Sequence, residues 1–314
     1  MNRIVAIVGP TAVGKSWLGL ALAEALPGEI ISADALQAYR GFDLGTAKPS
    51  LQEQKQVRHH LIDIREPDEA YSAGEFARLA EDSLFDIRRR TRRPLVVGGS
   101  GLYLRALLDG ISPIPPISPE IRDELRQQLE NEGLETLFRR LESLDPATAA
   151  RLPHGDTQRI LRALEVGLST GRPLSSWLAD DPTGPGELRS VRIGLTLPRN
   201  VLYDRIAERV RSMIQAGWVE EVEGLLRDGI DPGVPAFQAI GYRQLAAHLG
   251  GQMSLEEAVA ETVRLSCRYA KRQMTWFRRE QSIFWFSMEN SQQCYLEAAR
   301  FLEDLGIGGE NDQD

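Results

Sequence analysis

A glycine-rich loop near the start of the chain could hold phosphate groups. It reads Gly9-Pro10-Thr11-Ala12-Val13-Gly14-Lys15-Ser16, which matches the pattern G-x-x-x-x-G-K-[ST] in full. In such loops the backbone N–H groups and the N-terminus of the next helix favour an anion, and the lysine adds a mobile cation. The serine hydroxyl can ligate Mg²⁺. The loop therefore predicts a site for a phosphate compound, with Ser16 as a metal ligand.

The loop does not identify that phosphate compound. Most such loops bind ATP or GTP, and an aspartate at the end of a neighbouring strand helps to hold magnesium. Here the apolar stretch 95–97 is followed by Gly98-Gly99-Ser100-Gly101, without an acid at its tip. Asp34 or Asp63 could take that role. A diphosphate compound other than a nucleotide is therefore also compatible with the loop.

The elements that must position this loop are strands that alternate with helices. β-Branched and apolar runs predict strands at 3–8, 29–32 and 94–97. Helical patterns cover 16–26 and 71–90, and Ser72 is a predicted N-cap with Glu75 three residues on. Such alternation predicts a parallel sheet covered on both faces. The expected fold is α/β, with a P-loop NTPase-like core.

A helical segment interrupts this core. The stretch 112–119 is rich in Pro and Ser, and 180–186 holds Asp, Pro and Gly, so both mark boundaries. Between them, 120–170 shows helical patterns and no convincing strand. A strand is predicted again at 191–197, followed by long helices at 199–216 and 255–279. We expect a discontinuous core of residues 1–112 and 187–307, an inserted all-helical domain at 113–186, and a disordered tail at 308–314.

Charge and composition limit the kind of partner. The formal net charge of −8 argues against non-specific coating of nucleic acid, which requires Lys and Arg to neutralise phosphates. Local basic surfaces remain at 88–93 and 264–279. No apolar stretch is long enough to cross a bilayer, and the chain starts directly with a strand-like segment, so a cytoplasmic location is expected. Cys267 and Cys294 have neither disulfide nor zinc spacing.

Several further motifs follow the loop in a fixed order. They are IISADALQAYR at 30–40, GTAKP at 45–49, HHLID at 59–63, GGSGLY at 98–103, the stretch 156–166 leading to Thr170-Gly171, QAIGYR at 238–243 and YAKRQMTWFR at 269–278. Together with the loop they closely resemble the signatures of the bacterial-type tRNA dimethylallyltransferases, also called tRNA isopentenyltransferases or the IPP transferase family. The resemblance runs from Gly9 to Arg279. Where the family more often has Ser, Thr and Thr-Arg-Gln, this chain has Ala35, Ser100 and Ser266-Cys267-Arg268.

The resemblance implies a specific transfer reaction. A dimethylallyl group would move from dimethylallyl diphosphate to N6 of adenosine 37, next to the anticodon, in tRNAs that read codons beginning with U. The products would be N6-(dimethylallyl)adenosine and diphosphate. The implied cofactor is Mg²⁺, the implied partners are the tRNA anticodon stem-loop and dimethylallyl diphosphate, and the expected state is a monomer. Whether ATP also binds the loop stays open.

Three residues are assigned catalytic roles by this resemblance. Asp34 would take a proton from the adenine amine, and its predicted place at the end of a strand suits ligand binding; on residue type alone, it could equally cap the following turn. Ser100 could orient Asp34 or the amine, or cap a helix. Arg209, rather than Arg205, would contact the diphosphate; composition alone favours a solvated helix face that pairs with Asp204 or Glu208.

The resemblance also implies contacts with tRNA. They fall in four stretches and at the single position Ser100. The stretches are Asp34, Ala35, Leu36 and Gln37; Gln158, Arg159, Ile160, Leu161 and Arg162; Ala239, Ile240, Gly241, Tyr242, Arg243 and Gln244; and Lys271, Arg272, Gln273, Met274, Thr275, Trp276, Phe277 and Arg278. Gln37 is placed to read the edge of the adenine. Cations interleaved with aromatic residues in the last stretch suit phosphate contact and stacking. Without the resemblance, that stretch is more often an amphipathic helix with its aromatic side in the core.

Two other functional classes share parts of this pattern. A nucleoside or small-metabolite kinase would have the same loop and core, and would transfer a γ-phosphoryl group. A non-catalytic tRNA-binding protein could use the loop as a regulatory nucleotide site. The histidines His59 and His60 lack metal-ligand spacing, so we expect them to be structural or to orient substrate.

Overall fold

The computed structural model describes residues 3–180 and 190–307. They form two compact units, one from the described parts of 1–108 and 187–314, the other from those of 109–186. The sequence predicts an insertion at 113–186, whereas the second unit starts at Asp109. The predicted tail at 308–314 and the break after Asp180 lie outside the described residues. None of the described helices is long and apolar enough to cross a membrane.

The first unit is built on a six-stranded sheet with the order β3-β2-β4-β1-β5-β6. The strands are β1 (Ile4–Val8), β2 (Gly28–Ala33), β3 (His59–His60), β4 (Arg93–Gly98), β5 (Ser190–Thr196) and β6 (Ile283–Ser287). Every neighbouring pair is parallel. All residues of β1 are buried, because helices cover both faces of a parallel sheet.

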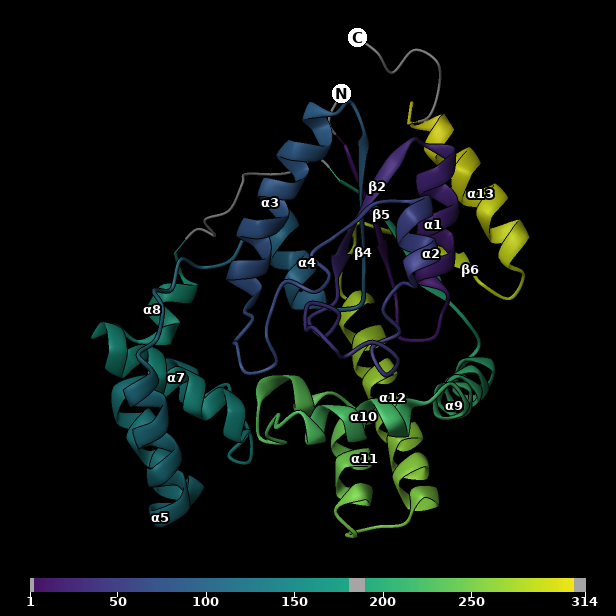
Figure 1. The fold of residues 1–314 in the computed structure, drawn as a ribbon. Helices are drawn as coiled ribbons and strands as arrows, with labels where there is room; N and C mark the ends of the chain where they lie inside the picture. Colours follow the sequence, from purple (N-terminus) through teal and green to yellow (C-terminus); the bar gives the residue numbers. More distant parts are fainter. Residues whose placement is uncertain (1–2, 181–189, 308–314) are drawn as a thin grey trace. The chain divides into compact units, whose positions relative to one another are not determined.

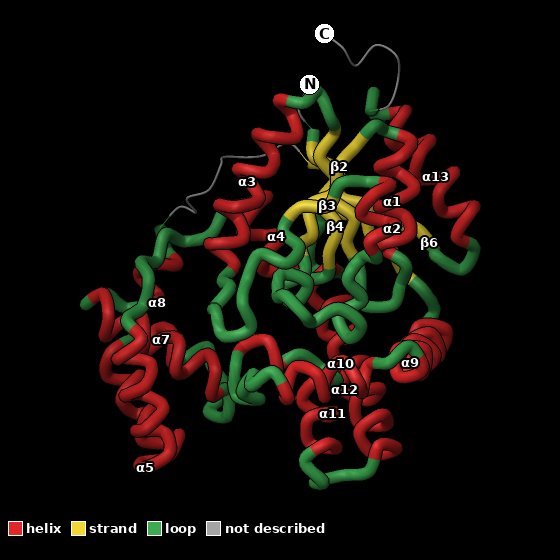
Figure 2. The backbone as a smooth tube through the Cα atoms, in the orientation of Figure 1, coloured by secondary structure: helices red, strands yellow, loops and turns green. Residues whose placement is uncertain are grey.

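Helices lie on both faces of this sheet (Figures 1 and 2). On one side are α1 (Lys15–Ala25) and α13 (Ser291–Asp304), and on the other are α3 (Ala73–Arg89) and α4 (Gly101–Leu108). The short helix α2 (Leu51–Gln56) follows the loop after β2. The core between the sheet and α1 includes Ile7, Leu18, Leu22 and Leu95, all fully buried. This packing fixes the position of the glycine loop, which joins β1 to α1.

The remaining helices of the first unit form a second apolar cluster. They are α9 (Arg199–Gln215), α10 (Trp218–Arg227), α11 (Tyr242–Leu249) and α12 (Leu255–Phe277), with a 3₁₀ turn at Pro235–Gln238. Trp218, Phe237 and Tyr242 pack there with Phe42, from the loop after β2. A Cβ at Gly45 would lie 2.3 Å from the Trp218 ring, so glycine permits this close approach. The cluster therefore holds the loop after β2 against the helices.

The named elements of the second unit are all helices. It contains α5 (Pro119–Leu144), α6 (Pro146–Ala149), α7 (Thr157–Thr170) and α8 (Leu174–Leu178). The path of α5 is broken at Gly133, where φ is 78°, a left-handed conformation that glycine adopts without strain. Leu125, Leu141, Ile160 and Leu164 form its core. This unit agrees with the predicted absence of strands between 120 and 170.

Most predicted elements are confirmed within one or two residues. The predicted cap of α3 is also confirmed, since the Ser72 hydroxyl accepts a hydrogen bond from Glu75 N at 3.2 Å. The edge strand β6 and the helix α13 were not predicted. β6 completes the sheet beyond β5. α13 packs near α1, and its residues Cys294, Ala298 and Leu302 are buried in the core between the sheet and α1.

Candidate active site

Three strand ends meet at one edge of the sheet. Val8 of β1 and Ala33 of β2 are both in register with Gly98 of β4. The glycine loop, Asp34 and Ser100 continue from these ends, so the topology brings together segments that are distant in sequence. A Cβ at Gly98 would lie 2.2 Å from the Ala33 carbonyl oxygen. Only glycine lets β2 and β4 approach this closely.

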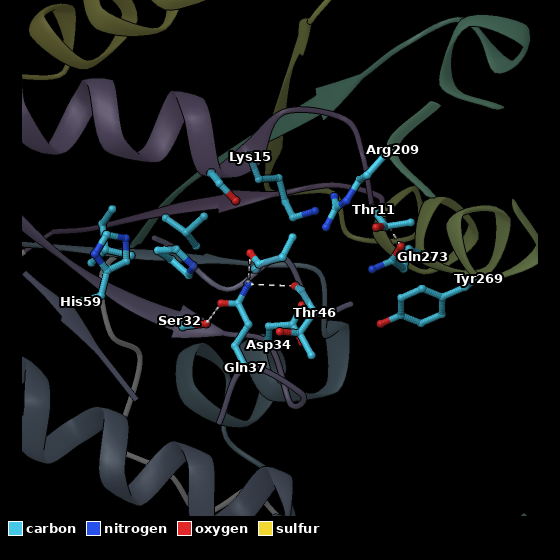
Figure 3. Close-up of a pocket in the computed structure, with 16 residues that line it drawn as sticks. Thr11, Lys15, Ser32, Asp34, Gln37, Thr46, His59, Arg209, Tyr269 and Gln273 are labelled. Carbon is cyan, nitrogen blue, oxygen red and sulfur yellow. Dashed lines mark hydrogen bonds between the residues drawn. The ribbon is translucent and has the colours of Figure 1, made fainter. Parts of the chain in front are cut away.

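A pocket at this edge gathers several predicted site residues. Its lining comprises Thr11, Lys15, Ser16, Ile30, Ser32, Asp34, Gln37, Thr46, Ala47, Pro49, His59, Val97, Gly98, Arg209, Tyr269 and Gln273 (Figure 3). Lys15 and Arg209 point into it from opposite elements, α1 and α9. Asp34 is the only acid among the described residues that line it. The pocket therefore combines two cations with one carboxylate.

Electrostatics in the pocket can be followed through Lys15. The pKa of Lys15 is lowered to about 8, chiefly by burial; the attraction of Asp34 opposes this shift, and the nearby Arg209 adds to it. Burial also lowers the pKa of Arg209, again against the attraction of Asp34. The ammonium of Lys15 donates to the Pro10 carbonyl at 2.7 Å. Burial removes part of the hydration of the Lys15 and Arg209 cations, and an anionic ligand in the pocket would compensate for that loss.

Asp34 combines both readings of its sequence position. Its Oδ1 accepts a hydrogen bond from Leu36 N at 3.0 Å, so it does support the following turn. The carboxylate also lines the pocket beside the two cations. The hydrogen bond that supports the turn uses only Oδ1 of Asp34. The other carboxylate oxygen can therefore still face a ligand.

Gln37 also lines the pocket, but its amide is engaged within the protein. Its Oε1 accepts from the Ser32 hydroxyl at 2.7 Å, and its Nε2 donates to the carbonyls of Thr46 at 3.3 Å and Ala47 at 3.1 Å. These bonds are drawn in Figure 3. The predicted reading of the adenine edge would require them to break. In this structure Gln37 instead ties the loop at 46–47 to β2.

Arg209, not Arg205, faces the centre of the pocket. Arg205 donates to the Met288 carbonyl at 3.1 Å and lines an adjoining hollow, which Lys15, Ser16 and Arg209 also line. Gly14 has φ of 111°, and a Cβ there would lie 2.4 Å from the Met288 methyl group. The end of β6 thus supports the loop from outside, a contact with a strand that was not predicted.

Tyr269 is a pocket residue that the sequence did not single out by role. It lies on α12, and burial raises the pKa of its hydroxyl to about 12, while hydrogen bonds from Ser100 and Gln273 oppose this shift. Its hydroxyl therefore stays protonated near neutral pH. Ser100 itself is not among the described residues that line the pocket, and its catalytic role stays a prediction. The spacing Tyr269 to Gln273, one helical turn, was the available signal that both share a face.

The two adjacent histidines have different surroundings. His59 lines the pocket, and burial lowers its pKa; its Nδ1 lies 2.8 Å from the Val57 carbonyl. His60 lies 2.7 Å from the Glu29 carboxylate, which is buried and also bound by Arg90. His60 is therefore structural, and His59 remains available to orient a ligand.

The pocket offers a partial set of magnesium ligands. Within the described residues no group of three His, Cys, Asp or Glu side chains could hold a metal. Mg²⁺ commonly keeps several waters and binds through one or two protein oxygens plus substrate phosphates. Ser16 is exposed and lines the pocket with Asp34. These oxygens fit a magnesium ion that arrives with a diphosphate.

The predicted tRNA contacts separate by exposure. Exposed members are Gln158, Arg159, Arg243, Lys271, Arg272, Thr275 and Arg278. Buried members are Ile160, Ala239, Gly241, Tyr242, Gln273 and Phe277. Partly exposed members are Asp34, Ala35, Leu36, Gln37, Ser100, Leu161, Arg162, Ile240, Gln244, Met274 and Trp276.

Some of the residues predicted to contact tRNA have buried side chains. Ile160 is in the core of the helical unit, Tyr242 is in the α9–α12 cluster, and Phe277 is 2% exposed. Their side chains pack against apolar neighbours and do not face solvent. Trp276 stacks with Arg105, whose guanidinium lies 4.6 Å from the ring centroid. The stretch 271–278 is thus amphipathic: Phe277 is buried in the protein, whereas Lys271, Arg272 and Arg278 are exposed.

Comparisons with known proteins agree with these features. The family model described as IPP transferase matches residues 37–280. A tRNA dimethylallyltransferase of Geobacter metallireducens is 49% identical over 289 residues, which cover 90% of this chain and 92% of that protein. The crystal structure of a tRNA isopentenylpyrophosphate transferase from Bacillus halodurans is 38% identical, with a TM-score of 0.69 and 98% of both chains covered.

A more distant structure shares the fold. It is a eukaryotic dimethylallyltransferase acting on tRNA, 24% identical, with a TM-score of 0.79 over 99% of this chain and 82% of that one. The family model spans most of the chain and includes Asp34's neighbour Gln37, Arg209 and Gln273, all of which line the pocket. With the glycine loop and the parallel sheet, these matches show that the chain belongs to the IPP transferase family.

Proposed function

We propose that the chain transfers a dimethylallyl group from dimethylallyl diphosphate to N6 of adenosine 37 in tRNA. The observation that carries this proposal is the presence of Asp34, Lys15 and Arg209 in one pocket at the glycine loop. Alkylation of an amine by a diphosphate ester needs a proton acceptor and stabilisation of an anionic leaving group. The pocket supplies residue types for both tasks, and membership of the family supports the assignment.

The bond changes assign a role to Asp34. The lone pair of N6 attacks the allyl carbon, the bond from that carbon to the diphosphate oxygen breaks, and its electrons leave with diphosphate. The amine is a weak nucleophile because its lone pair is delocalised into the adenine ring. Asp34 accepts the proton that N6 loses, so that neutral N6-(dimethylallyl)adenosine results.

The leaving group is stabilised by the cations of the loop and α9. Lys15 and Arg209 offset the negative charge that grows on the diphosphate oxygens. Ser16, with the phosphates, would hold Mg²⁺, which supplies further stabilisation of that charge when bound. Tyr269 lines the pocket together with Asp34, and its hydroxyl, on which Ser100 acts, would orient the amine. The amide of Gln37 holds the loop that closes the opposite side.

The RNA must present an unstacked adenine. An A-form groove is too narrow for side chains to read, so a loop base has to leave its stack to reach Asp34. The exposed cations Lys271 and Arg272 of α12, and Arg278 just after its end, would contact the backbone phosphates near the pocket. The protein is expected to work as a cytoplasmic monomer, where tRNA is available.

A transfer assay tests this function. The protein is incubated with labelled dimethylallyl diphosphate, Mg²⁺ and unmodified tRNA, and the label is followed into N6-modified adenosine. Incorporation at adenosine 37 supports the proposal. With a kinase or a passive tRNA-binding protein, the label would stay in dimethylallyl diphosphate. Transfer of the label from γ-labelled ATP would identify a kinase directly.

A further inference from the structure

Gln273 is a buried polar residue at the junction of three segments. It is 6% exposed and lies on α12, far in sequence from the glycine loop. Its Oε1 accepts a hydrogen bond from Thr11 N at 2.8 Å, and its Nε2 donates to the Gly99 carbonyl at 3.0 Å. Figure 3 shows the Gln273 amide directed at Thr11. One side chain therefore joins α12, the glycine loop and the end of β4.

These two bonds fix the orientation of the amide. Thr11 N can only donate and the Gly99 carbonyl can only accept, so the oxygen of Gln273 must face the loop and its nitrogen must face β4. A Cβ at Gly99 would lie 2.3 Å from Nε2, so glycine at this position makes room for the amide. A glutamate would place an acceptor against the Gly99 carbonyl, and a methionine would lose both bonds.

The bond to Thr11 also limits which groups can bind a phosphate. The backbone N–H of Thr11 donates to Gln273, and that of Val13 donates to the Pro10 carbonyl at 3.4 Å, so the loop amides that can face a diphosphate are those of Ala12, Gly14, Lys15 and Ser16. An unsatisfied buried donor is costly, so the loop would move without its partner. Ala12 already has φ of 62°, which shows how tightly the loop path is constrained.

We propose that Gln273 is a positioning residue that holds the glycine loop in its diphosphate-binding shape from α12. The resemblance alone assigns Gln273 to the tRNA contact, whereas its burial and both hydrogen bonds place its action on the loop. The proposal rests on the proposed function only for the identity of the diphosphate compound. Binding of inorganic diphosphate tests it without the transfer reaction.

The test compares Gln273→Met with a matched substitution on the surface, Gln292→Met, at an exposed position of α13. Inorganic diphosphate with Mg²⁺ is titrated calorimetrically into each protein in the absence of RNA. We expect the Kd for diphosphate to rise about tenfold in Gln273→Met, the effect of one unsatisfied buried donor. The Kd for an anticodon stem-loop should change less than twofold. Gln292→Met should leave both constants unchanged.

A second measurement guards against general damage to the fold. Hydrogen exchange of the peptide that contains Thr11 reports its bond directly, and we expect exchange to speed up in Gln273→Met while peptides from α3 stay protected. Gln273→Glu keeps an acceptor for Thr11, so that amide should stay protected while diphosphate binding still weakens by charge repulsion. Unchanged diphosphate affinity together with weaker stem-loop binding would overturn the proposal. Wild-type transfer activity, measured in parallel, shows separately whether the proposed function holds.

Discussion

Replacing Asp34 by asparagine tests the proton-transfer step most directly. The change keeps the size of the side chain and an oxygen for the hydrogen bond from Leu36 N, so the turn after β2 should persist. It removes the only acid among the described residues that line the pocket. General-base catalysis contributes about 10²–10⁴-fold to rates. We therefore expect the single-turnover rate to fall by that factor, about 3–5 kcal/mol of transition-state stabilisation.

Binding should respond in the opposite sense to the rate. Asp34 attracts Lys15 and raises its pKa against the effect of burial. In the Asp34→Asn protein that pKa falls below about 8, so the comparison is best made at about pH 6.5, where Lys15 remains a cation. Loss of a negative charge beside the diphosphate then favours its binding. Affinity for diphosphate should be equal or higher, although turnover is lost.

The assay is a single turnover with excess enzyme, labelled dimethylallyl diphosphate and an anticodon stem-loop, together with stem-loop binding by filter retention. Asp68→Asn, at an exposed position, is the matched control and should behave as the unchanged protein. A rate within tenfold of the unchanged protein would refute the base role. So would a loss of stem-loop affinity as large as the loss of rate, because Asp34 would then act in binding. His59 is the next candidate base if the rate survives.

Three further outcomes are expected. Burial lowers the pKa of Lys15 to about 8, so diphosphate binding to the free protein should weaken as pH rises through that value, and Lys15→Met should remove this dependence in calorimetric titrations. Glu221→Gln should destabilise the protein by about 1–3 kcal/mol in urea unfolding, because the half-buried carboxylate accepts from both Leu44 N and the Tyr242 hydroxyl and an amide nitrogen would face one of these donors. Glu223→Gln serves as the control, and equal midpoints would contradict the reasoning. Gly98→Ala should slow transfer and lower stability by about 1–3 kcal/mol, since its Cβ would overlap the Ala33 carbonyl beside Asp34; unchanged kinetics would show that β2 adjusts freely.

Local sequence patterns determined the parts of this protein that depend on local geometry. The glycine loop follows β1 and leads into α1 because its glycines and the helix start are encoded in consecutive residues. The Ser72 cap and the strands around it follow from short-range hydrogen bonding and apolar periodicity in the same way. The family resemblance then assigned Asp34 and Arg209 to one reaction. The strand β3 was not predicted because it has only two residues. The edge strand β6 was not predicted because most of its residues are exposed.

Tertiary structure decided which side chains are free to act. Gln37 and Gln273 stand in motifs that imply contact with RNA, yet their amides are consumed by Thr46 and Ala47 in one case and by Thr11 and Gly99 in the other. Sequence spacing could not reveal this, because a hydrogen bond between Thr11 and Gln273 joins residues separated by 262 positions. A buried polar group takes whatever partner the fold brings near it. That partner depends on the packing of α12 against the sheet, which no local pattern contains.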